Sequence, residues 1–214
     1  MKTVLLYSGG LDSTVLLYKL KEDKHDVHCF LANYGQRHKK ELSFAKRHCS
    51  RHSIPFSEVH LQTYAGSSQT SEYIDVPEGH YEDESMKKTV VPNRNMILIA
   101  NAVALAITQK ASQVAIAAHA GDHAIYPDCR PEFLDTMRHA TCIATEWTPV
   151  DLFFPFWSID KTEIVRLGDR LGVPFELTWS CYKGLDFHCG KCGTCIERRE
   201  AFELAGIEDF TVYV

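Results

Sequence analysis

Val4-Leu5-Leu6-Tyr7-Ser8-Gly9-Gly10-Leu11-Asp12-Ser13-Thr14 is an apolar run that passes through two glycines and several hydroxyl side chains into a helical pattern. Glycine can take φ > 0 and lets backbone N–H groups approach an anion, and the N-terminus of a helix attracts negative charge. The segment therefore predicts a strand, a loop that binds nucleotide phosphates, and a helix. The alternative is an ordinary strand-turn-helix corner, because Ser, Gly and Asp are also common in turns.

The loop lacks the lysine of a Walker motif. A Walker loop needs Gly-Lys-Ser/Thr so that the lysine reaches the β- and γ-phosphates, whereas Asp12 precedes Ser13 here. Hydrolysis at the γ-phosphate is therefore the less favoured chemistry. The order Ser-Gly-Gly-x-Asp-Ser resembles the PP-loop of the ATP pyrophosphatases, which implies that a substrate oxygen attacks the α-phosphate of ATP to form an adenylate. Asp12 is a candidate Mg²⁺ ligand and catalytic residue. The predicted ATP contacts are Tyr7, Ser8, Gly9, Gly10, Leu11, Asp12, Ser13 and Thr14.

The composition favours a protein that acts on a small molecule. The chain has 214 residues, enough for one well-buried core with an appendage, and a formal net charge of −5. Most duplex-binding proteins carry a basic excess, so we expect no stable complex with nucleic acid. No stretch reaches the roughly 20 apolar residues of a membrane span. Four of the eight cysteines lie within 181–195, unlike a secreted disulfide framework. We therefore predict a cytoplasmic protein without a membrane partner.

Apolar runs typical of strands alternate with helical patterns along the chain. This alternation predicts an α/β fold with a doubly wound, mainly parallel five-stranded sheet. The resemblance of the first loop to a PP-loop implies a fold similar to that of the adenine nucleotide alpha hydrolases. Asp160 and Glu163 form a capping-box pattern at the start of the last helix. We predict an ATP-binding domain over 1–175 and a metal-binding segment over 176–214, and the connection 62–92 has a length typical of lids or disordered segments. The expected strands are 3–7, 26–33, 55–61, 113–118 and 150–154, and the expected helices are 12–21, 38–52, 94–110, 131–145 and 160–171.

Polar side chains cluster in the segments that follow the expected strands, where ligands bind in doubly wound sheets. Tyr34, Gln36 and Arg37 follow the second strand, and we expect them to contact the ribose and base of ATP. Arg94 and Lys161 lie in the first turns of two helices, where a cation opposes the helix dipole, so both are candidate catalytic residues that neutralise phosphate. A tolerated surface position is the alternative for both.

The segment 122–130 is the richest of these loops. A carboxylate beside an arginine suits a planar, purine-like acid: Asp128 would accept hydrogen bonds from a ring N–H and an exocyclic amine, and Arg130 would bind a carboxylate. A simple Asp–Arg turn pair is the alternative. His38 and His119 are interpreted as solvated residues. The predicted substrate contacts are Asp122, Tyr126, Asp128 and Arg130.

Four cysteines near the C-terminus predict a metal site: Cys181, Cys189, Cys192 and Cys195. Tetrahedral zinc suits four thiolates, and this ligand set leaves no open position for water, so the zinc should be structural. An iron–sulfur cluster is an alternative, because Cys-x₂-Cys-x₂-Cys also occurs in ferredoxin-like sequences. Cysteines without a metal are the second alternative.

Five motifs in the same order resemble those of the 7-cyano-7-deazaguanine synthase family (QueC), whose members are PP-loop enzymes of queuosine precursor synthesis. The motifs are 8–14, 33–38, 91–95, 126–130 and the four cysteines, so the resemblance spans almost the whole chain. It implies a C–N bond-forming ligase that converts 7-carboxy-7-deazaguanine, ammonia and ATP into the nitrile through an adenylated acid and an adenylated amide. It also implies ATP with Mg²⁺ at 8–14, structural Zn²⁺ on the cysteines, and a homodimer.

The chain departs from the family pattern at two places. Asn93 stands where the family usually has a small residue, and Ala124-Ile125 stands where it has Ser-Gly. These departures concern the choice of acid more than the use of ATP. Two other functions fit parts of the sequence. A tRNA sulfur transferase of the same superfamily would deliver sulfur from a cysteine such as Cys129, and a nucleotide-binding module with a zinc knuckle would release no pyrophosphate.

Overall fold

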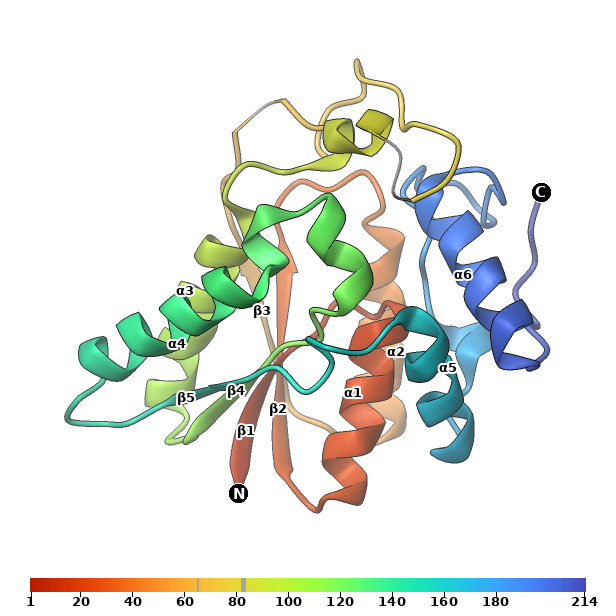
Figure 1. Ribbon diagram of the computed structural model, residues 1–214. Helices are drawn as coiled ribbons and strands as arrows, with labels where there is room; N and C mark the ends of the chain where they lie inside the picture. The colour runs from red at the N-terminus through yellow and green to blue at the C-terminus, as the bar shows by residue number, and fades with distance from the viewer. Residues whose placement is uncertain (65, 82–83) are drawn as a thin grey trace.

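The structure is a computed structural model that describes residues 1–64, 66–81 and 84–214 (Figure 1). Five parallel strands form one sheet in the order β3-β2-β1-β4-β5, which confirms the predicted doubly wound topology. The strands are β1 (Lys2–Leu6), β2 (Asp26–Asn33), β3 (Phe56–His60), β4 (Gln113–Ala115) and β5 (Asp151–Phe153). The α-helices are α1 (Leu11–Glu22), α2 (Lys40–Arg51), α3 (Arg94–Thr108), α4 (Pro131–Ala144), α5 (Lys161–Arg170) and α6 (Gly193–Ala205), and the 3₁₀ helices are η1 (Glu84–Thr89), η2 (Ala120–Ala124), η3 (Pro127–Cys129) and η4 (Phe175–Leu177). Within the described ranges, none of the helices is long and apolar enough to cross a bilayer.

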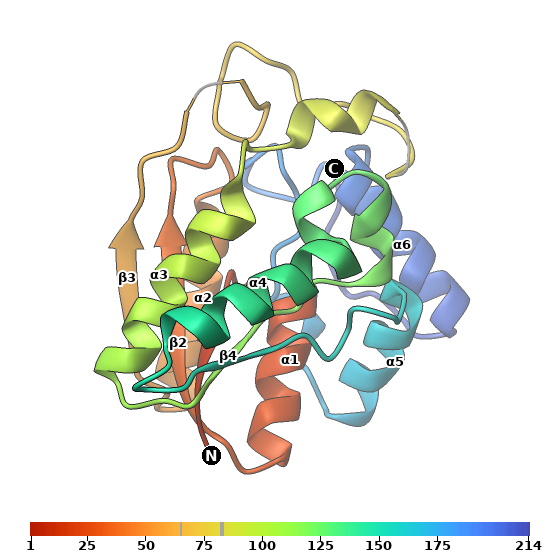
Figure 2. The same cartoon turned by 60° about the vertical axis from the view of Figure 1, so that its left-hand side comes forward.

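The sheet separates two apolar cores. Successive side chains of a strand point to opposite faces. Val4 and Phe30 pack with α3 and α4 on one face, whereas Leu5 and Leu31 pack with α1, α2 and α5 on the other. Figures 1 and 2 show these two helical layers from directions 60° apart.

The best-marked helix in the sequence forms as predicted. At the start of α5 the carboxylate of Asp160 accepts a hydrogen bond from the backbone N–H of Glu163 at 2.8 Å. The carboxylate of Glu163 in turn accepts one from the backbone N–H of Asp160 at 3.2 Å. This capping box places Lys161 at the first position of the helix. The strand predicted over 113–118 ends earlier, at Ala115, because the following residues turn into the wall of a cavity.

Helix α6 is missing from the predicted elements. Its buried face includes Cys195 and Arg198, so the sequence lacks the apolar spacing that marks most amphipathic helices. The helix lies beside α5, where the Arg166 guanidinium donates to the carbonyl of Leu204 at 2.7 Å (Figure 1). The division of the chain at residue 175 stays a prediction.

The described parts of the connection, residues 62–64, 66–81 and 84–92, pass over the carboxyl edge of the sheet (Figure 2). In its described part, the Ser67 hydroxyl donates to the carbonyl of Thr89 at 3.0 Å. The backbone N–H of Arg37 donates to the carbonyl of Gln69 at 2.7 Å, and the side chains of Ser67 and Gln69 are fully buried. The contact between Arg37 and Gln69 attaches this part of the connection to the segment that follows β2, so it covers that edge.

Candidate active site

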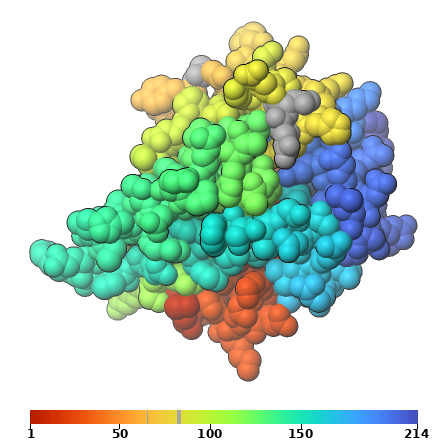
Figure 3. All heavy atoms as spheres, viewed as in Figure 1, coloured from red at the N-terminus to blue at the C-terminus, as the bar shows by residue number. Residues whose placement is uncertain are grey.

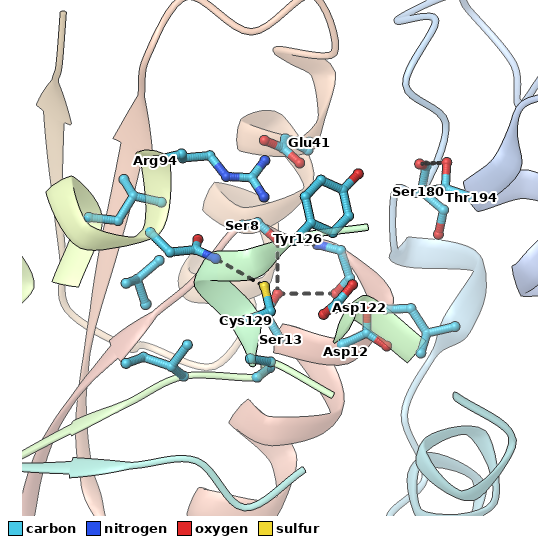
Figure 4. A pocket seen from close by; sticks show the side chains of 18 of the residues that line it. Ser8, Asp12, Ser13, Glu41, Arg94, Asp122, Tyr126, Cys129, Ser180 and Thr194 are labelled. Atoms are coloured by element: carbon cyan, nitrogen blue, oxygen red, sulfur yellow. Dashed lines mark hydrogen bonds between the residues drawn. The ribbon is translucent and has the colours of Figure 1, made fainter. Parts of the chain in front are cut away.

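A cavity of about 220 Å³ opens at the carboxyl ends of β1, β2 and β4. β1 is where the strand order reverses, since β2 lies on one side of it and β4 on the other. Ligands of doubly wound sheets bind at this position. Figure 4 shows Asp12 and Asp122 on one side of the cavity and Glu41 with Arg94 on another. The cavity therefore brings together side chains from separate parts of the chain.

The predicted phosphate loop forms one end of the cavity. The Ser8 hydroxyl accepts from the backbone N–H of Gly10 and lies 3.1 Å from the hydroxyl of Ser13. Gly10 is the N-cap of α1, so the positive end of that helix also faces the cavity. The Thr14 hydroxyl instead donates to the Gly10 carbonyl at 2.7 Å. All of the predicted loop contacts except Gly9 and Thr14 line the cavity.

Gly9 fixes the loop against α2. Its φ of 83° lies in the left-handed region, which strongly favours glycine. A Cβ at this position would lie 2.5 Å from the carbonyl oxygen of Glu41 and 2.7 Å from the backbone nitrogen of Ala45. A side chain larger than that of glycine would therefore displace the loop from α2.

An ionic cluster lies beside the phosphate loop. The ammonium of Lys161 lies 2.6 Å from the carboxylate of Glu197 and 3.4 Å from that of Asp12. The His119 ring lies 3.6 Å from the carboxylate of Asp122 and 3.9 Å from that of Asp12. Desolvation lowers the pKa of Lys161, but the surrounding carboxylates outweigh it and hold the pKa above its ordinary value. Lys161 is therefore fully protonated at neutral pH.

Two members of this cluster, His119 and Glu197, were not predicted from the sequence to belong to the site. His119 is 1% exposed, so its interpretation as a solvated histidine is wrong. Glu197 does not belong to any predicted motif, because its role depends on how α6 packs against the loop after β5. Desolvation raises the pKa of Glu197. Burial also acts to raise the pKa of Asp122, but the charges of His119 and Lys161 and the hydrogen bond from Tyr81 outweigh it and lower that pKa.

Among the residues that the structure describes, the cluster leaves one buried carboxylate oxygen without a hydrogen bond. It contains the carboxylates of Asp12, Asp122 and Glu197 but only one lysine. In the part of the chain that the structure describes, the buried Oδ1 atom of Asp12 accepts no hydrogen bond. A hard cation such as Mg²⁺ prefers such carboxylate oxygens.

Arg94 occupies the other end of the cavity. Its guanidinium donates to the side-chain oxygen of Gln69 at 3.1 Å and to the Tyr34 hydroxyl at 3.4 Å. It lies 5.9 Å from the centre of the Tyr34 ring and 5.7 Å from that of Tyr126. Within residues 1–64, 66–81 and 84–214, no carboxylate forms a salt bridge with Arg94. The guanidinium is therefore available to an anionic ligand.

Glu41 and His38 border the same end and lie near Arg94. The carboxylate of Glu41 accepts from the Gln36 amide at 3.0 Å and lies 3.5 Å from the His38 ring. Burial raises the pKa of Glu41 to about 7. Burial, together with the nearby arginines, lowers the pKa of His38 to about 3, so His38 is neutral at pH 7. Its interpretation as a solvated residue is wrong, since it is 3% exposed; the i,i+3 spacing of His38 and Glu41 at a helix start was the available signal.

Other predicted site residues lie outside the cavity wall. The Gln36 amide supports the backbone of Tyr34, and the Arg37 guanidinium donates to the carbonyl of Ile74 at 3.0 Å. The carboxylate of Asp128 accepts from a backbone N–H at the start of α3, and the exposed Arg130 donates to a loop carbonyl at 2.9 Å. The predicted direct contacts of Asp128 and Arg130 with a substrate therefore find no support in the geometry, whereas Asp122 and Tyr126 do line the cavity.

The two departures from the family pattern also avoid the cavity wall. Asn93 has a φ of 55°, and Asn is one of the few residues other than Gly that adopt this conformation readily. Ile125 is 5% exposed and packs in the core beneath α4, while Ala124 is exposed. Neither change alters the chemistry of the cavity directly.

The four C-terminal cysteines form a compact buried group. Their Sγ atoms all lie within 4.8 Å of one another. The backbone N–H groups of Cys192 and Lys191 donate to the Cys189 sulfur at 3.3 and 3.4 Å, as is usual around thiolates that ligate a metal. The Cys189 N–H donates similarly to Cys181. The group therefore fits a tetrahedral metal ion.

The cysteine-bearing segment also forms part of the cavity. Trp179, Ser180 and Thr194 line it, and the Thr194 hydroxyl donates to the Ser180 carbonyl at 2.9 Å (Figure 4). On the surface, the C-terminal residues lie against those that follow β5 (Figure 3). The C-terminal segment thus completes the site in addition to holding the cysteines.

Comparison with known proteins identifies close sequence relatives. The family described as queuosine biosynthesis protein QueC matches residues 2–206. A 7-cyano-7-deazaguanine synthase from Rhizobium johnstonii is 48% identical over 217 aligned residues, which cover 100% of this chain and 92% of that protein. One from Brucella ovis is also 48% identical, with 94% of its length covered. Among solved structures, NMN synthetase from Francisella tularensis aligns with a TM-score of 0.53 at 16% identity over 97% of this chain and 78% of that one, which shows a shared fold.

Proposed function

The chain belongs to the QueC family of queuosine biosynthesis proteins, and we propose that it is the ATP-dependent ligase that converts 7-carboxy-7-deazaguanine and ammonia into 7-cyano-7-deazaguanine. The family match gives it a role in the synthesis of the queuosine precursor. The relatives that carry the synthase name align along the full length of this chain. The steps of the reaction are inferred from the cavity.

One observation carries the proposal: a single cavity joins a phosphate loop to a partly buried guanidinium. Ser8, Ser13 and Lys161 lie at one end, and Arg94 lies at the other. An adenylating enzyme must hold the phosphates of ATP and an acceptor acid against each other so that they react as if in one molecule. This cavity offers a cationic group to each.

The chemistry requires that the acid lose both oxygens. An oxygen of the carboxylate attacks the α-phosphate of ATP, and pyrophosphate leaves. Ammonia then displaces AMP with loss of a proton and gives the amide. The amide oxygen attacks a second ATP, pyrophosphate and a proton leave, and elimination of AMP with a further proton gives the nitrile. Lys161 and the N–H groups at the start of α1 stabilise the charge that develops on each pyrophosphate.

We place the acceptor acid at Arg94 rather than at Arg130. A planar guanidinium binds a carboxylate through two parallel hydrogen bonds. The rings of Tyr34 and Tyr126 flank this guanidinium and offer apolar faces to a planar base. Glu41 lies nearby and offers a carboxylate to ring N–H groups of the ligand.

Two metals and an assembly state complete the proposal. Asp12 would hold Mg²⁺, which when bound offsets charge on the phosphates of ATP. The four cysteines would hold a structural Zn²⁺. The family resemblance supports a cytoplasmic homodimer, and the net charge of −5 argues against a stable nucleic-acid complex.

The direct test is turnover by the zinc-loaded protein. We expect incubation with ATP, Mg²⁺, ammonium and 7-carboxy-7-deazaguanine to give the nitrile and AMP by mass spectrometry. Lys161→Met should abolish both products, whereas the exposed Lys110→Met should leave them unchanged. A zinc-loaded wild-type protein that forms neither product would refute the assignment.

Sulfur transfer is the second candidate, because Cys129 lines the cavity. The Asn95 amide donates to its sulfur at 3.1 Å, and burial raises the pKa of the thiol. A thiol held in its neutral form is a poor nucleophile. The geometry therefore favours nitrile synthesis.

A further inference from the structure

Glu197 reaches the phosphate end of the cavity from the metal-binding segment. It follows Cys195 by two residues on α6. Its Oε2 atom accepts from the ammonium of Lys161 at 2.6 Å, a shorter distance than the 3.4 Å between Lys161 and Asp12. Both side chains of this pair are largely buried, with 12% and 13% of their surface exposed. Water therefore screens the interaction only weakly.

The second oxygen of Glu197 packs against Gly121. A Cβ at position 121 would lie 3.0 Å from the Oε1 atom of Glu197 and 3.0 Å from the His119 ring. The backbone N–H of Gly121 donates to that ring at 3.1 Å. The carboxylate thus lies between the start of α5 and the loop after β4, and a Cβ at position 121 would require Glu197 or His119 to shift by a few tenths of an ångström.

Two anchors fix the position of α6 itself. At its start, Cys192 and Cys195 belong to the four-cysteine group. The next residue after Glu197, Arg198, is 1% exposed and donates to the carbonyl of Phe175 at 3.0 Å and to the carboxylate of Asp209 at 3.0 Å. The backbone that carries Glu197 is consequently held from both sides.

Lys161 needs such a partner. It is the first residue of α5, where the helix dipole repels a cation. Asp12 and Asp122 are the other carboxylates near it, and Asp12 is the proposed ligand of Mg²⁺. Without Glu197, the ammonium would pair with Asp12 and compete with Mg²⁺ for that carboxylate.

We propose that Glu197 is a positioning residue that holds the Lys161 ammonium at the phosphate end of the cavity, so that the metal-bound segment controls how the enzyme handles pyrophosphate. The proposal rests on the proposed function in one respect, namely that Lys161 contacts pyrophosphate. It gives the cysteine site a consequence for catalysis in addition to its effect on folding.

A double-mutant cycle on the zinc-loaded full chain tests this inference, with inorganic pyrophosphate and Mg²⁺ as the ligand in calorimetry. We expect Glu197→Ala to weaken pyrophosphate binding about tenfold, and Glu197→Gln to restore most of it, because the amide oxygen accepts the same hydrogen bond. In a Lys161→Met background, Glu197→Ala should have no further effect. The exposed Glu203→Gln on the same helix is the matched control and should bind like wild type.

Several results would contradict it: unchanged or tighter binding in Glu197→Ala, or equal losses with and without Lys161. Zinc content measured for each variant separates positioning from damage to the metal site, and loss of zinc in both Glu197 variants would also count against the proposal. Pyrophosphate binding does not require the acid substrate. A wild-type protein that makes no nitrile but shows the expected cycle would therefore refute the proposed reaction and leave this inference standing.

Discussion

The carboxylate of Asp128 accepts a hydrogen bond from the backbone N–H of Asn95 at 2.9 Å. The side-chain amide of Asn95 in turn donates to the carbonyl of Asp128 at 3.1 Å. This reciprocal pair joins η3 to the first turn of α3, one residue after Arg94. Asp128 therefore supports the guanidinium from behind the cavity wall.

Asp128→Ala should lower the free energy of unfolding by about 1 kcal/mol, as loss of a helix cap does. We also expect a severalfold rise in the KM for the acid, since Arg94 loses its support, while the KM for ATP changes little. Urea denaturation and steady-state kinetics measure the two effects. Asp135→Ala, an exposed change on α4, is the control; equal effects in both variants would contradict the role of Asp128.

Arg94→Lys should raise the KM for 7-carboxy-7-deazaguanine tenfold or more, because an ammonium cannot form the paired hydrogen bonds of a guanidinium. Arg130→Lys should change it less than about twofold, since Arg130 is exposed and bonded to a loop carbonyl. Kinetics with the acid varied at saturating ATP compare the two variants. A larger rise in KM for Arg130→Lys than for Arg94→Lys would instead place the acid at Arg130, as the sequence predicts.

Glu41→Gln should make stability less dependent on pH. Burial raises the pKa of Glu41 from its ordinary value of 4.5 to about 7 in the folded protein, so the folded state binds this proton more tightly than the unfolded chain does. Its contribution is fully present below pH 4.5 and is lost as the pH rises through 7. The melting temperature of the variant relative to wild type should therefore rise between pH 5 and pH 8, by an amount equivalent to at most about 3 kcal/mol. A constant difference across this range would contradict the raised pKa.

Cys192→Ser should reduce bound zinc from about one ion per chain to a small fraction, because a structural site needs all four ligands. The melting temperature should fall as the C-terminal segment loosens. Cys142→Ser, at an exposed position on α4, should leave metal content and stability unchanged. Metal analysis and calorimetry provide the readouts, and a broad visible absorption band in anaerobically purified protein would favour an iron–sulfur cluster instead.

Cys129→Ser should retain nitrile synthesis, with no more than a modest loss from altered packing around Asn95. The proposed reaction needs no protein nucleophile, since ammonia attacks the activated acid directly. Product formation by mass spectrometry checks this. Complete loss of activity in a normally folded variant would favour covalent sulfur chemistry.

The sequence allowed prediction of the features that depend on neighbouring residues. The capping box at Asp160 and the whole of β2 lie where the sequence places them. The phosphate loop is also local, because Gly9, Gly10 and the hydroxyl residues follow one another in the chain. The four cysteines lie within 181–195, so their spacing alone predicts that they bind one metal ion together.

The features that escaped prediction depend on contacts between distant segments. In the sequence, His38 belongs to a basic stretch that is typical of a solvated helix start. In the structure, the Tyr182 ring packs against the His38 ring, with 5.2 Å between the ring centroids. Arg94 and Arg130 both adjoin candidate loops, and only the folded chain shows which of them borders the cavity. Helix α6 carries Glu197 on a buried face that lacks apolar periodicity. In each case the contacts made between distant segments decide the outcome.

Ser8 and Thr194 line the same cavity although nearly the whole chain separates them. A ribosome therefore releases the phosphate loop long before it releases the residues that complete the site. Contacts over such sequence separations form late in folding, because long loops must close first. During synthesis, the site therefore stays incomplete until α6 has emerged and taken its place beside α5.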